Sequence, residues 1–376
     1  MAFYSPSSTL VPGDGNGTRD VFIADRTTGE VERASVASDG TEGNDTSTLV
    51  SLSADGRYVA YDSLASNLVA GDGNRTTDIF LRDREAGTTE RASVSSDGTE
   101  GNAHSDRPVV SANGRYVAFD SSASNLVPGD VNGRPDVFVH DRETGTTELV
   151  SATATGAGGN GISYAASISS DGRYVAYYSS ASDLVAGDTN RAQDVFVRDR
   201  QTGTTERVSV GAGGAQSNGS SMFPSLSSDG RFVAFHSIAS NLAPGDRNQT
   251  SDVFLHDRLS GTTERISVAG DGTEGDGVSG QASVSADGRL VVFESLATNL
   301  VAGDTNDRRD VFVHDRGAGT TELLSVAGDG THGDAVSDSV DISADGRYAA
   351  FRSYASNLVR GDTNDLADIF LRELGG

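Results

Sequence analysis

The sequence predicts an all-β fold, a β-propeller of four-stranded antiparallel blades, and three observations carry this prediction. A Gly-Asp-x-Asn tetrad returns every 58 residues without an insertion. Each period holds short segments of alternating apolar and polar residues bounded by Gly, Asp and Asn, which is the pattern of strands and hairpins. No segment of useful length has a helical period. A fixed period favours radial repetition, because each blade buries its faces on equivalent neighbours.

The unit that begins at residue 146 illustrates the four expected strands. The segment 146–152 (TTELVSA) is a short strand entered through a turn at 143–145, and 164–169 (YAASIS) is a second strand that stops at the turn 170–172. The segment 173–179 (RYVAYYS) is a third strand, with Tyr174, Ala176 and Tyr178 on one face and Val175 and Tyr177 on the other. The fourth strand, 194–199 (DVFVRD), follows after a long loop. Both hairpins are local, as in a propeller blade. A parallel β-helix has shorter coils, and a β-sandwich gives no reason for a fixed period.

Counting these segments predicts one β-propeller domain over residues 1–376, with a partial repeat at 1–28 and six full repeats at 29–376. The third and fourth strands of the unit occur seven times, which favours seven blades. One of these blades then lacks its inner strand. Six blades are the alternative, and they would leave residues 1–27 as a hairpin with exposed edges. Met1 aligns with Val117, so we expect the chain to begin inside a strand, with a further strand pair and any export signal encoded upstream.

The repeat resembles a known family. Residues 53–61 (SADGRYVAY) followed by 78–83 (DIFLRD) are similar to the WD40-like, or PD40-type, repeat of TolB-like β-propellers. The likeness covers essentially the whole chain. Two departures are the replacement of the family's Pro in Ser-Pro-Asp-Gly and the long insertion before the last strand. The resemblance implies a protein-interaction or ligand-binding scaffold, usually with six blades, and it transfers no catalytic residue.

Composition narrows the function. The 376 residues carry a formal charge of −25 and a pI of about 4.4, which disfavours nucleic acid and anionic membranes as partners. There is no Cys, which excludes disulfides and thiolate chemistry, and every one of the 29 basic residues is Arg. No apolar run is long enough to span a membrane, and the N-terminus lacks a signal-peptide pattern. With the Asp-rich, Lys-free composition, this favours an extracytoplasmic (secreted or periplasmic) bacterial protein.

The loop between the third and fourth strands of the unit predicts calcium sites. Its pattern Gly-Asp-x-Asn-x-x-x-Asp occurs seven times, and Ca²⁺ prefers carboxylate and amide oxygens on a flexible loop. The predicted ligands are Asp14, Asn16, Asp20, Asp72, Asn74, Asp78, Asp130, Asn132, Asp136, Asp188, Asn190, Asp194, Asp246, Asn248, Asp252, Asp304, Asn306, Asp310, Asp362, Asn364 and Asp368. The alternative is a purely structural Asx-turn, which Asp and Asn form without metal.

A second set of acidic loops is expected beside these loops. In a propeller they emerge together with the loops that join one repeat to the next, for example Asp39-Gly40-Thr41-Glu42 and Asp271-Gly272-Thr273-Glu274. One end of each blade is therefore expected to be strongly negative, and to attract divalent cations or a basic partner.

One variable column stands out against the regular repeat. The residue after the aromatic of the third strand is Tyr4, Asp62, Asp120, Tyr178, His236, Glu294 or Arg352, and we expect this column to contact a ligand or partner. The alternative is a solvent-exposed position that varies freely. His140, His256 and His314 share a column with Arg82 and Arg198, so they are interpreted as solvated positions rather than as a metal site.

Three functions remain open from the sequence. The favoured one is a non-enzymatic, calcium-stabilised scaffold that binds a protein or glycan through its acidic loops. A carbohydrate-binding propeller is the second, although the repeats lack an invariant exposed aromatic residue. A hydrolase or lyase with a central-channel site is the third, and no loop has unique chemistry. The signatures of zinc proteases, α/β-hydrolases and P-loop enzymes do not occur in the sequence.

Overall fold

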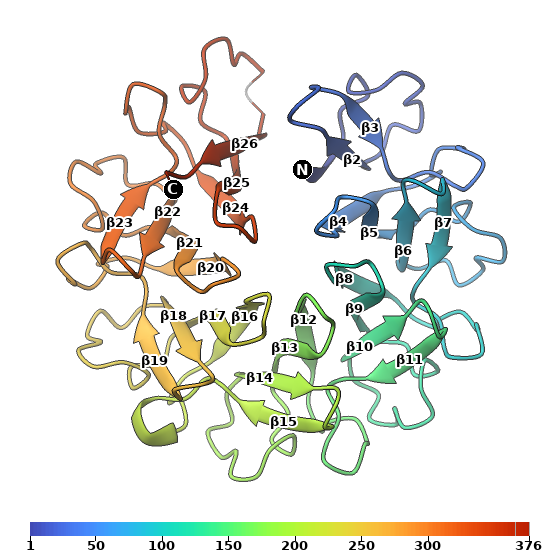
Figure 1. Cartoon of the computed structure of the whole chain (residues 1–376), viewed down its shortest axis with the longest axis horizontal. Helices are drawn as coiled ribbons and strands as arrows, with labels where there is room; N and C mark the ends of the chain where they lie inside the picture. Colours follow the sequence, from blue (N-terminus) through green and yellow to red (C-terminus); the bar gives the residue numbers. More distant parts are fainter. Residues whose placement is uncertain (365, 376) are drawn as a thin grey trace. The chain divides into compact units, whose positions relative to one another are not determined.

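The computed structural model describes residues 1–364 and 366–375, which form seven antiparallel sheets, the blades of a β-propeller (Figure 1). The chain divides into two compact units, residues 1–187 with 198–205 and residues 188–197 with 206–376. The first three sheets are β1 (Ala2–Ser5), β2 (Asp20–Ala24) and β3 (Val31–Arg33); β4 (Ser47–Leu52), β5 (Tyr58–Ser63), β6 (Asp78–Asp83) and β7 (Thr88–Arg91); and β8 (Ser105–Val110), β9 (Tyr116–Ser121), β10 (Asp136–Asp141) and β11 (Thr146–Leu149).

The remaining sheets repeat the same plan. They are β12 (Ser163–Ile168), β13 (Tyr174–Ser179), β14 (Asp194–Asp199) and β15 (Thr204–Arg207); β16 (Ser221–Leu226), β17 (Phe232–Ser237), β18 (Asp252–Asp257) and β19 (Thr262–Arg265); β20 (Ser279–Val284), β21 (Leu290–Ser295), β22 (Asp310–Asp315) and β23 (Thr320–Leu323); and β24 (Ser337–Ile342), β25 (Tyr348–Ser353) and β26 (Asp368–Glu373). A single 3-10 turn, η1 (Ala212–Gly214), interrupts this pattern in the described residues. In that part of the chain no helix has the length and apolar character needed to cross a membrane.

The strands follow each other in chain order within every sheet, as expected for local hairpins. The six-blade alternative is wrong, because β1–β3 form a sheet of their own without an inner strand. The predicted strands of the unit at residue 146 are confirmed to within a few residues. The strand at 146–152 is shorter than expected, because β11 ends at Leu149. The last sheet, β24–β26, also has three strands, with no outer strand among the described residues.

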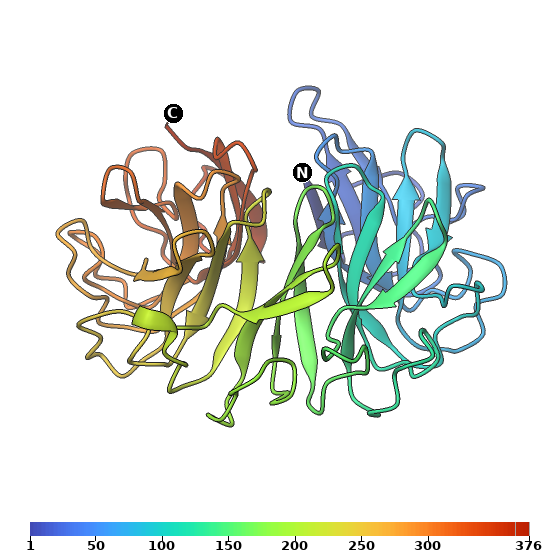
Figure 2. The same ribbon diagram turned by 60° about the horizontal axis from the view of Figure 1, so that its bottom comes forward.

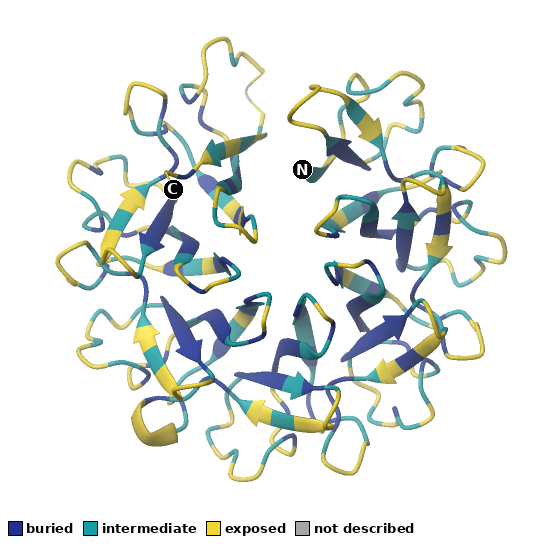
Figure 3. Ribbon diagram, in the orientation of Figure 1, coloured by how far each residue is buried: buried dark blue, intermediate teal, exposed yellow. Residues whose placement is uncertain are grey.

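The core lies around the two middle strands of the blades, which are mostly buried, while the outer strands and many loops are exposed (Figure 3). The exceptions are β1 in the first sheet and β26 in the last, which are half-buried or exposed. Aromatic residues form a ladder in this core: Phe119 and Phe138 are fully buried, and their rings stack at 6.0 Å between centroids. The same pair recurs as Phe235–Phe254 and Phe293–Phe312. Burial of each ring stabilises the fold by roughly 1.5–3 kcal/mol, which compensates for the low hydrophobic content.

Adjacent blades interlock at the Asp-Gly-Arg and Asn-Gly-Arg turns. Gly114 has φ +73° and lies so close to the ring of Tyr58, in the preceding blade, that an added Cβ would be 1.9 Å from Cδ2. The guanidinium of Arg142 covers the other side of that ring, 4.5 Å from its centroid. Arg142 also pairs with Glu90, on the outer strand of the preceding blade. These contacts bind the third blade to the second and neutralise charge at that end.

The interpretation of the histidine column as solvated is wrong. His140, His256 and His314 are 5–7% exposed, and Nδ1 of each is hydrogen-bonded to the hydroxyl of a threonine on the outer strand at 2.9 Å. Burial lowers the pKa of all three imidazoles. A neutral ring with a hydroxyl partner can be buried where Arg82 and Arg198 remain half-exposed.

Candidate functional site

Two kinds of loop meet at one end of each blade, as expected. The Asp loop joins the two middle strands, for example residues 6–19 between β1 and β2, and the return loop leads to the next inner strand, for example residues 34–46. Within each unit these loops lie at the strand ends opposite the Asp-Gly-Arg turns (Figure 2). The amide of Asn16 donates to Gly43 O at 2.9 Å, and the Glu42 carboxylate accepts from Gly15 N at 3.1 Å. Hydrogen bonds therefore join the two loops.

The asparagine of each Asp loop forms an Asx-turn. Its side-chain oxygen accepts the backbone N–H two residues on at 2.7–2.9 Å, and its nitrogen donates to the second aspartate at 2.6–3.3 Å, in all seven copies. This is the structural role that the sequence left open as the alternative.

The second aspartate is also engaged in hydrogen bonds. Asp20 is fully buried, and its Oδ1 accepts from the Ser35 hydroxyl at 2.5 Å. In the next five copies Asp78, Asp136, Asp194, Asp252 and Asp310 accept the equivalent serine hydroxyl at 2.5–2.6 Å. In the seventh copy Asp362 and Asp368 are half-buried and Asn364 is exposed. These bonds explain why the asparagine and the second aspartate recur without change.

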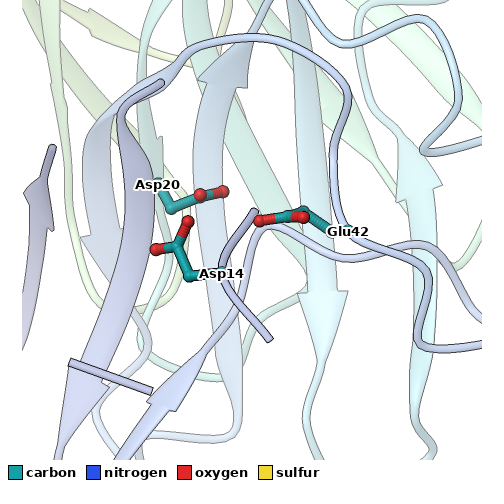
Figure 4. A group of neighbouring side chains, drawn as sticks. All are labelled: Asp14, Asp20 and Glu42. Atoms are coloured by element: carbon teal, nitrogen blue, oxygen red, sulfur yellow. The ribbon is translucent and has the colours of Figure 1, made fainter. Parts of the chain in front are cut away.

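The first aspartate meets different surroundings in different copies. In three copies it gathers with the second aspartate and a return-loop glutamate, with all ligand oxygens within 4.8 Å: Asp14, Asp20 and Glu42; Asp72, Asp78 and Glu100; and Asp246, Asp252 and Glu274. Figure 4 shows the first of these groups, with the carboxylates turned toward one another. Burial and the neighbouring Asp78 raise the pKa of Asp72 to about 6.

An arginine from the outer strand enters these groups. Nη1 of Arg33 bonds to Glu42 and lies 3.6 Å from Asp20 Oδ2 and 3.7 Å from Asp14 Oδ1. Sequence analysis missed this side chain, although the signal is present. Arg stands in this column wherever the return loop carries Glu or Gln, namely at Arg33, Arg91, Arg207 and Arg265 opposite Glu42, Glu100, Gln216 and Glu274. The guanidinium supplies positive charge inside the cluster, and calcium binding by the seven loops stays a prediction.

The variable column lies at the inner rim of the same loop end. The exposed alternative is wrong for Asp62, Asp120 and Tyr178, which are 2–7% exposed, while Tyr4 is exposed and the other three are half-buried. Each column residue from Asp62 onward faces the inner strand of its own blade. Thr48 donates its hydroxyl to Asp62 at 2.6 Å, Tyr164 packs on Tyr178, and Asp338 pairs with Arg352 at 2.8 Å.

A β-bulge in the inner strand brings further residues to this rim. The register shifts after Asp106, and Arg107 takes a left-handed conformation with φ +52°. Arg107 Nη1 thereby reaches Asp120 Oδ2 at 3.3 Å. The same oxygen accepts from Ala165 N, in the bulge of the next blade, at 3.0 Å. Asp120 Oδ1 has no hydrogen-bond partner, and burial raises the pKa of this carboxyl to about 7.

These residues border a cavity of about 310 Å³ in the first unit. Burial raises the pKa of Asp62, on its wall, to about 6, and the charge of Asp106 contributes to this rise. The full lining is Thr46, Thr48, Leu49, Asp62, Ser63, Leu64, Thr77, Asp106 and Arg107. Two carboxylates, a cation and several hydroxyls around a small apolar patch make this cavity a candidate polar binding site. The sequence pointed to Asp62 but not to Thr48, Asp106 or Arg107, whose inner-strand columns also vary.

No protein-family model matches the sequence, and no curated protein matches it. Solved structures, by contrast, match the chain over most of its length. TolB from Agrobacterium tumefaciens has a TM-score of 0.51 at 16% identity, over 95% of this chain and 98% of that one. The propeller domain of the trilobed protease from Pyrococcus furiosus has a TM-score of 0.57 at 11% identity, over 94% and 84%. TolB from Acinetobacter baumannii has a TM-score of 0.46 at 17% identity; the match covers 85% of this chain and spans 62% of that protein.

Peptidases that are about twice as long also match. This chain spans 47% of a prolyl endopeptidase, at 13% identity, and 45% of the acylaminoacyl peptidase from Pyrococcus horikoshii, at 10% identity. At these identities the likeness concerns the fold. The seven antiparallel sheets and these neighbours confirm the resemblance stated from the repeat. The chain therefore has the fold of a TolB-like β-propeller, in a seven-bladed form.

Proposed function

We propose that the chain is a non-enzymatic binding scaffold that recognises a basic segment of a protein partner at the inner rim of its loop end, in an extracytoplasmic compartment. The observation that carries this proposal is the cavity beside Asp62, Asp106 and Arg107 in the first unit. A TolB-like propeller is compatible with a scaffold role, and the site supplies the specificity.

Charge favours a basic partner. The chain carries a formal charge of −25, and the Asp and return loops add carboxylates around the rim. Such a field speeds the approach of a cationic segment. In the cavity, the Asp106 carboxylate is about one third exposed, so an incoming Lys or Arg side chain can reach it, while Arg107 is held by Asp120.

A glycan is the second candidate, because the cavity also carries the hydroxyls of Thr46, Thr48, Ser63 and Thr77. These groups and the carboxylates match the hydrogen-bonding pattern of sugar hydroxyls. Unlike a basic peptide, a neutral sugar would bind with little dependence on salt.

The proposal is tested with an Arg/Lys-rich peptide and a panel of neutral oligosaccharides, by calorimetric titration. We expect the peptide to bind, and Asp106→Asn to weaken its binding about tenfold, the effect of roughly 1.4 kcal/mol. The matched control is Asp39→Asn, which removes an exposed carboxylate from a return loop. Equal weakening by both variants would show unspecific charge attraction and contradict the cavity. Salt-insensitive sugar binding that Asp106→Asn abolishes would favour the glycan instead.

A further inference from the structure

We propose that two of the seven Asp loops, those of Asp130 and Asp304, each bind a divalent cation, and that an internal arginine takes the place of the cation in the first, second, fourth and fifth loops. The inference does not depend on the ligand proposed above, since it concerns the outer part of the blades. It follows from a comparison of the copies within this one chain.

The outer strand supplies a cation in four copies. Arg33, Arg91 and Arg265 lie 3.7–3.9 Å from the first aspartates of their copies, and Arg207 lies 3.7 Å from Asp188. Asp188 also accepts from Gln216 Nε2 at 2.8 Å. In each of these copies the first aspartate therefore has a positive or donor group from the same blade.

The third and sixth copies lack this cation. Leu149 and Leu323 stand in the arginine column, and the return loop has Gly158 or His332 instead of Glu or Gln. Asp130 and Asp304 are nevertheless 6% and 7% exposed, and Oδ1 of each is buried without a hydrogen-bond partner. The backbone N–H of Asn132 or Asn306 supports each carboxylate, but the buried Oδ1 stays without a partner. A buried carboxylate oxygen without a partner is unfavourable, unless it binds a proton or a metal ion.

The second aspartate of each loop lies near the first. The charge of Asp130 contributes to the raised pKa of Asp136, and Asp304 does the same for Asp310, so each pair lies close together. Two carboxylates on one loop are a common start for a divalent cation site, in which backbone carbonyls and water complete the shell.

The two loops differ in donor chemistry. At Asp130 the return loop has Gly158, which offers no side-chain ligand, so the carboxylate oxygens of Asp130 and Asp136 are the charged ligands available. This suits Ca²⁺. At Asp304 the charge of His332 lowers the pKa of both aspartates, which places the imidazole near them. Two carboxylates with an imidazole suit Zn²⁺ or Mn²⁺ as well as Ca²⁺.

The test is equilibrium dialysis of the EDTA-treated whole chain against about 1 mM CaCl₂, the upper range for extracellular calcium modules. Bound metal is counted by mass spectrometry, and ZnCl₂ is used in a second series. We expect close to two cations per chain, one fewer in Asp130→Asn, and none in the Leu149→Arg, Leu323→Arg double variant. His332→Ala should weaken Zn²⁺ at least tenfold and leave Ca²⁺ at the third loop unchanged.

The matched control is Asp246→Asn, in an arginine-bearing copy, which should leave the number of bound cations unchanged. Circular dichroism establishes that each variant is folded before its metal is counted. Seven cations per chain, equal loss in Asp246→Asn and Asp130→Asn, or no bound metal in the unaltered chain would each overturn the inference. The last result assigns protons to Asp130 and Asp304 and leaves peptide binding at the cavity unaffected.

Discussion

Asp120 holds a carboxyl group in surroundings that disfavour its charge. It is 2% exposed, with one oxygen held by Arg107 and Ala165 N and the other without a hydrogen-bond partner. Burial raises its pKa to about 7, far above the usual 3.8. The carboxyl at this rim is therefore expected to change charge near neutral pH, and the peptide binding proposed at the adjacent cavity should depend on pH.

This shift predicts a pH dependence of stability. The folded chain binds a proton at Asp120 below about pH 7, and the unfolded chain does so only below about pH 4. The free energy of unfolding should therefore rise as the pH falls between these values, by up to about 1.4 kcal/mol per pKa unit. Asp120→Asn should be more stable than the unaltered chain at pH 8 and lose this advantage toward pH 4. Urea unfolding at several pH values measures this, and parallel curves for the two proteins would contradict it.

Some properties of single residues cannot be predicted from the sequence, namely certain hydrogen bonds between distant columns and the burial of two aspartates. The recurrence of Asp14, Asn16 and Asp20 was correctly recognised as a constraint on the loop. Their hydrogen bonds to Thr18 N and the Ser35 hydroxyl, however, connect columns that no local motif links. Burial of Asp62 and Asp120 could not be read from an alternating strand, because it depends on a bulge in a neighbouring strand.

At the scale of the strand and turn, the sequence was a good guide. Alternation and turn residues located all four strands of a blade, since a period of two residues fixes which side chains enter the core. The shortness of the outer strands and the burial of His140 were not predicted. Both depend on how adjacent blades pack, for example on the Thr147 hydroxyl, which bonds to His140 and to Val94 O of the preceding blade.

The turn that joins the inner strand to the next strand yields a test of this packing. Gly114→Ala places a methyl group 1.9 Å from the ring of Tyr58, and we expect overpacking to destabilise the chain by about 1–3 kcal/mol. A positive φ adds about 1–2 kcal/mol for any residue with a Cβ. Gly98→Ala is the matched control, with φ +82° and no atom within 4 Å. Equal losses for the two variants in urea unfolding would show that the contact with Tyr58 is unimportant.

At the scale of the whole chain, charge is the dominant property. A formal charge of −25 opposes compaction through self-repulsion, even though arginines pair with carboxylates at both ends of the blades. Added salt should therefore raise the thermal midpoint by several degrees, because the Debye length falls to about 10 Å at 0.1 M. Differential scanning calorimetry in NaCl, repeated in choline chloride, separates screening from specific sodium binding. A fall of the midpoint in both salts would show that the ion pairs outweigh the repulsion.

The interlocking turns have a consequence for how the chain comes apart. The bonds between blades described above join residues 45–53 apart: Asp120 to Ala165 N, Arg142 to Glu90, and Thr147 to Val94 O. Within each unit a blade thus depends on its immediate neighbours, and stability is approximately a sum of nearest-neighbour terms. Loss of order in one blade exposes the groups that it covers on the preceding blade, as the third blade covers Tyr58 and Glu90, and the exposed blade becomes less stable. Within each unit, unfolding is then expected to proceed from one blade to the next rather than in one concerted step.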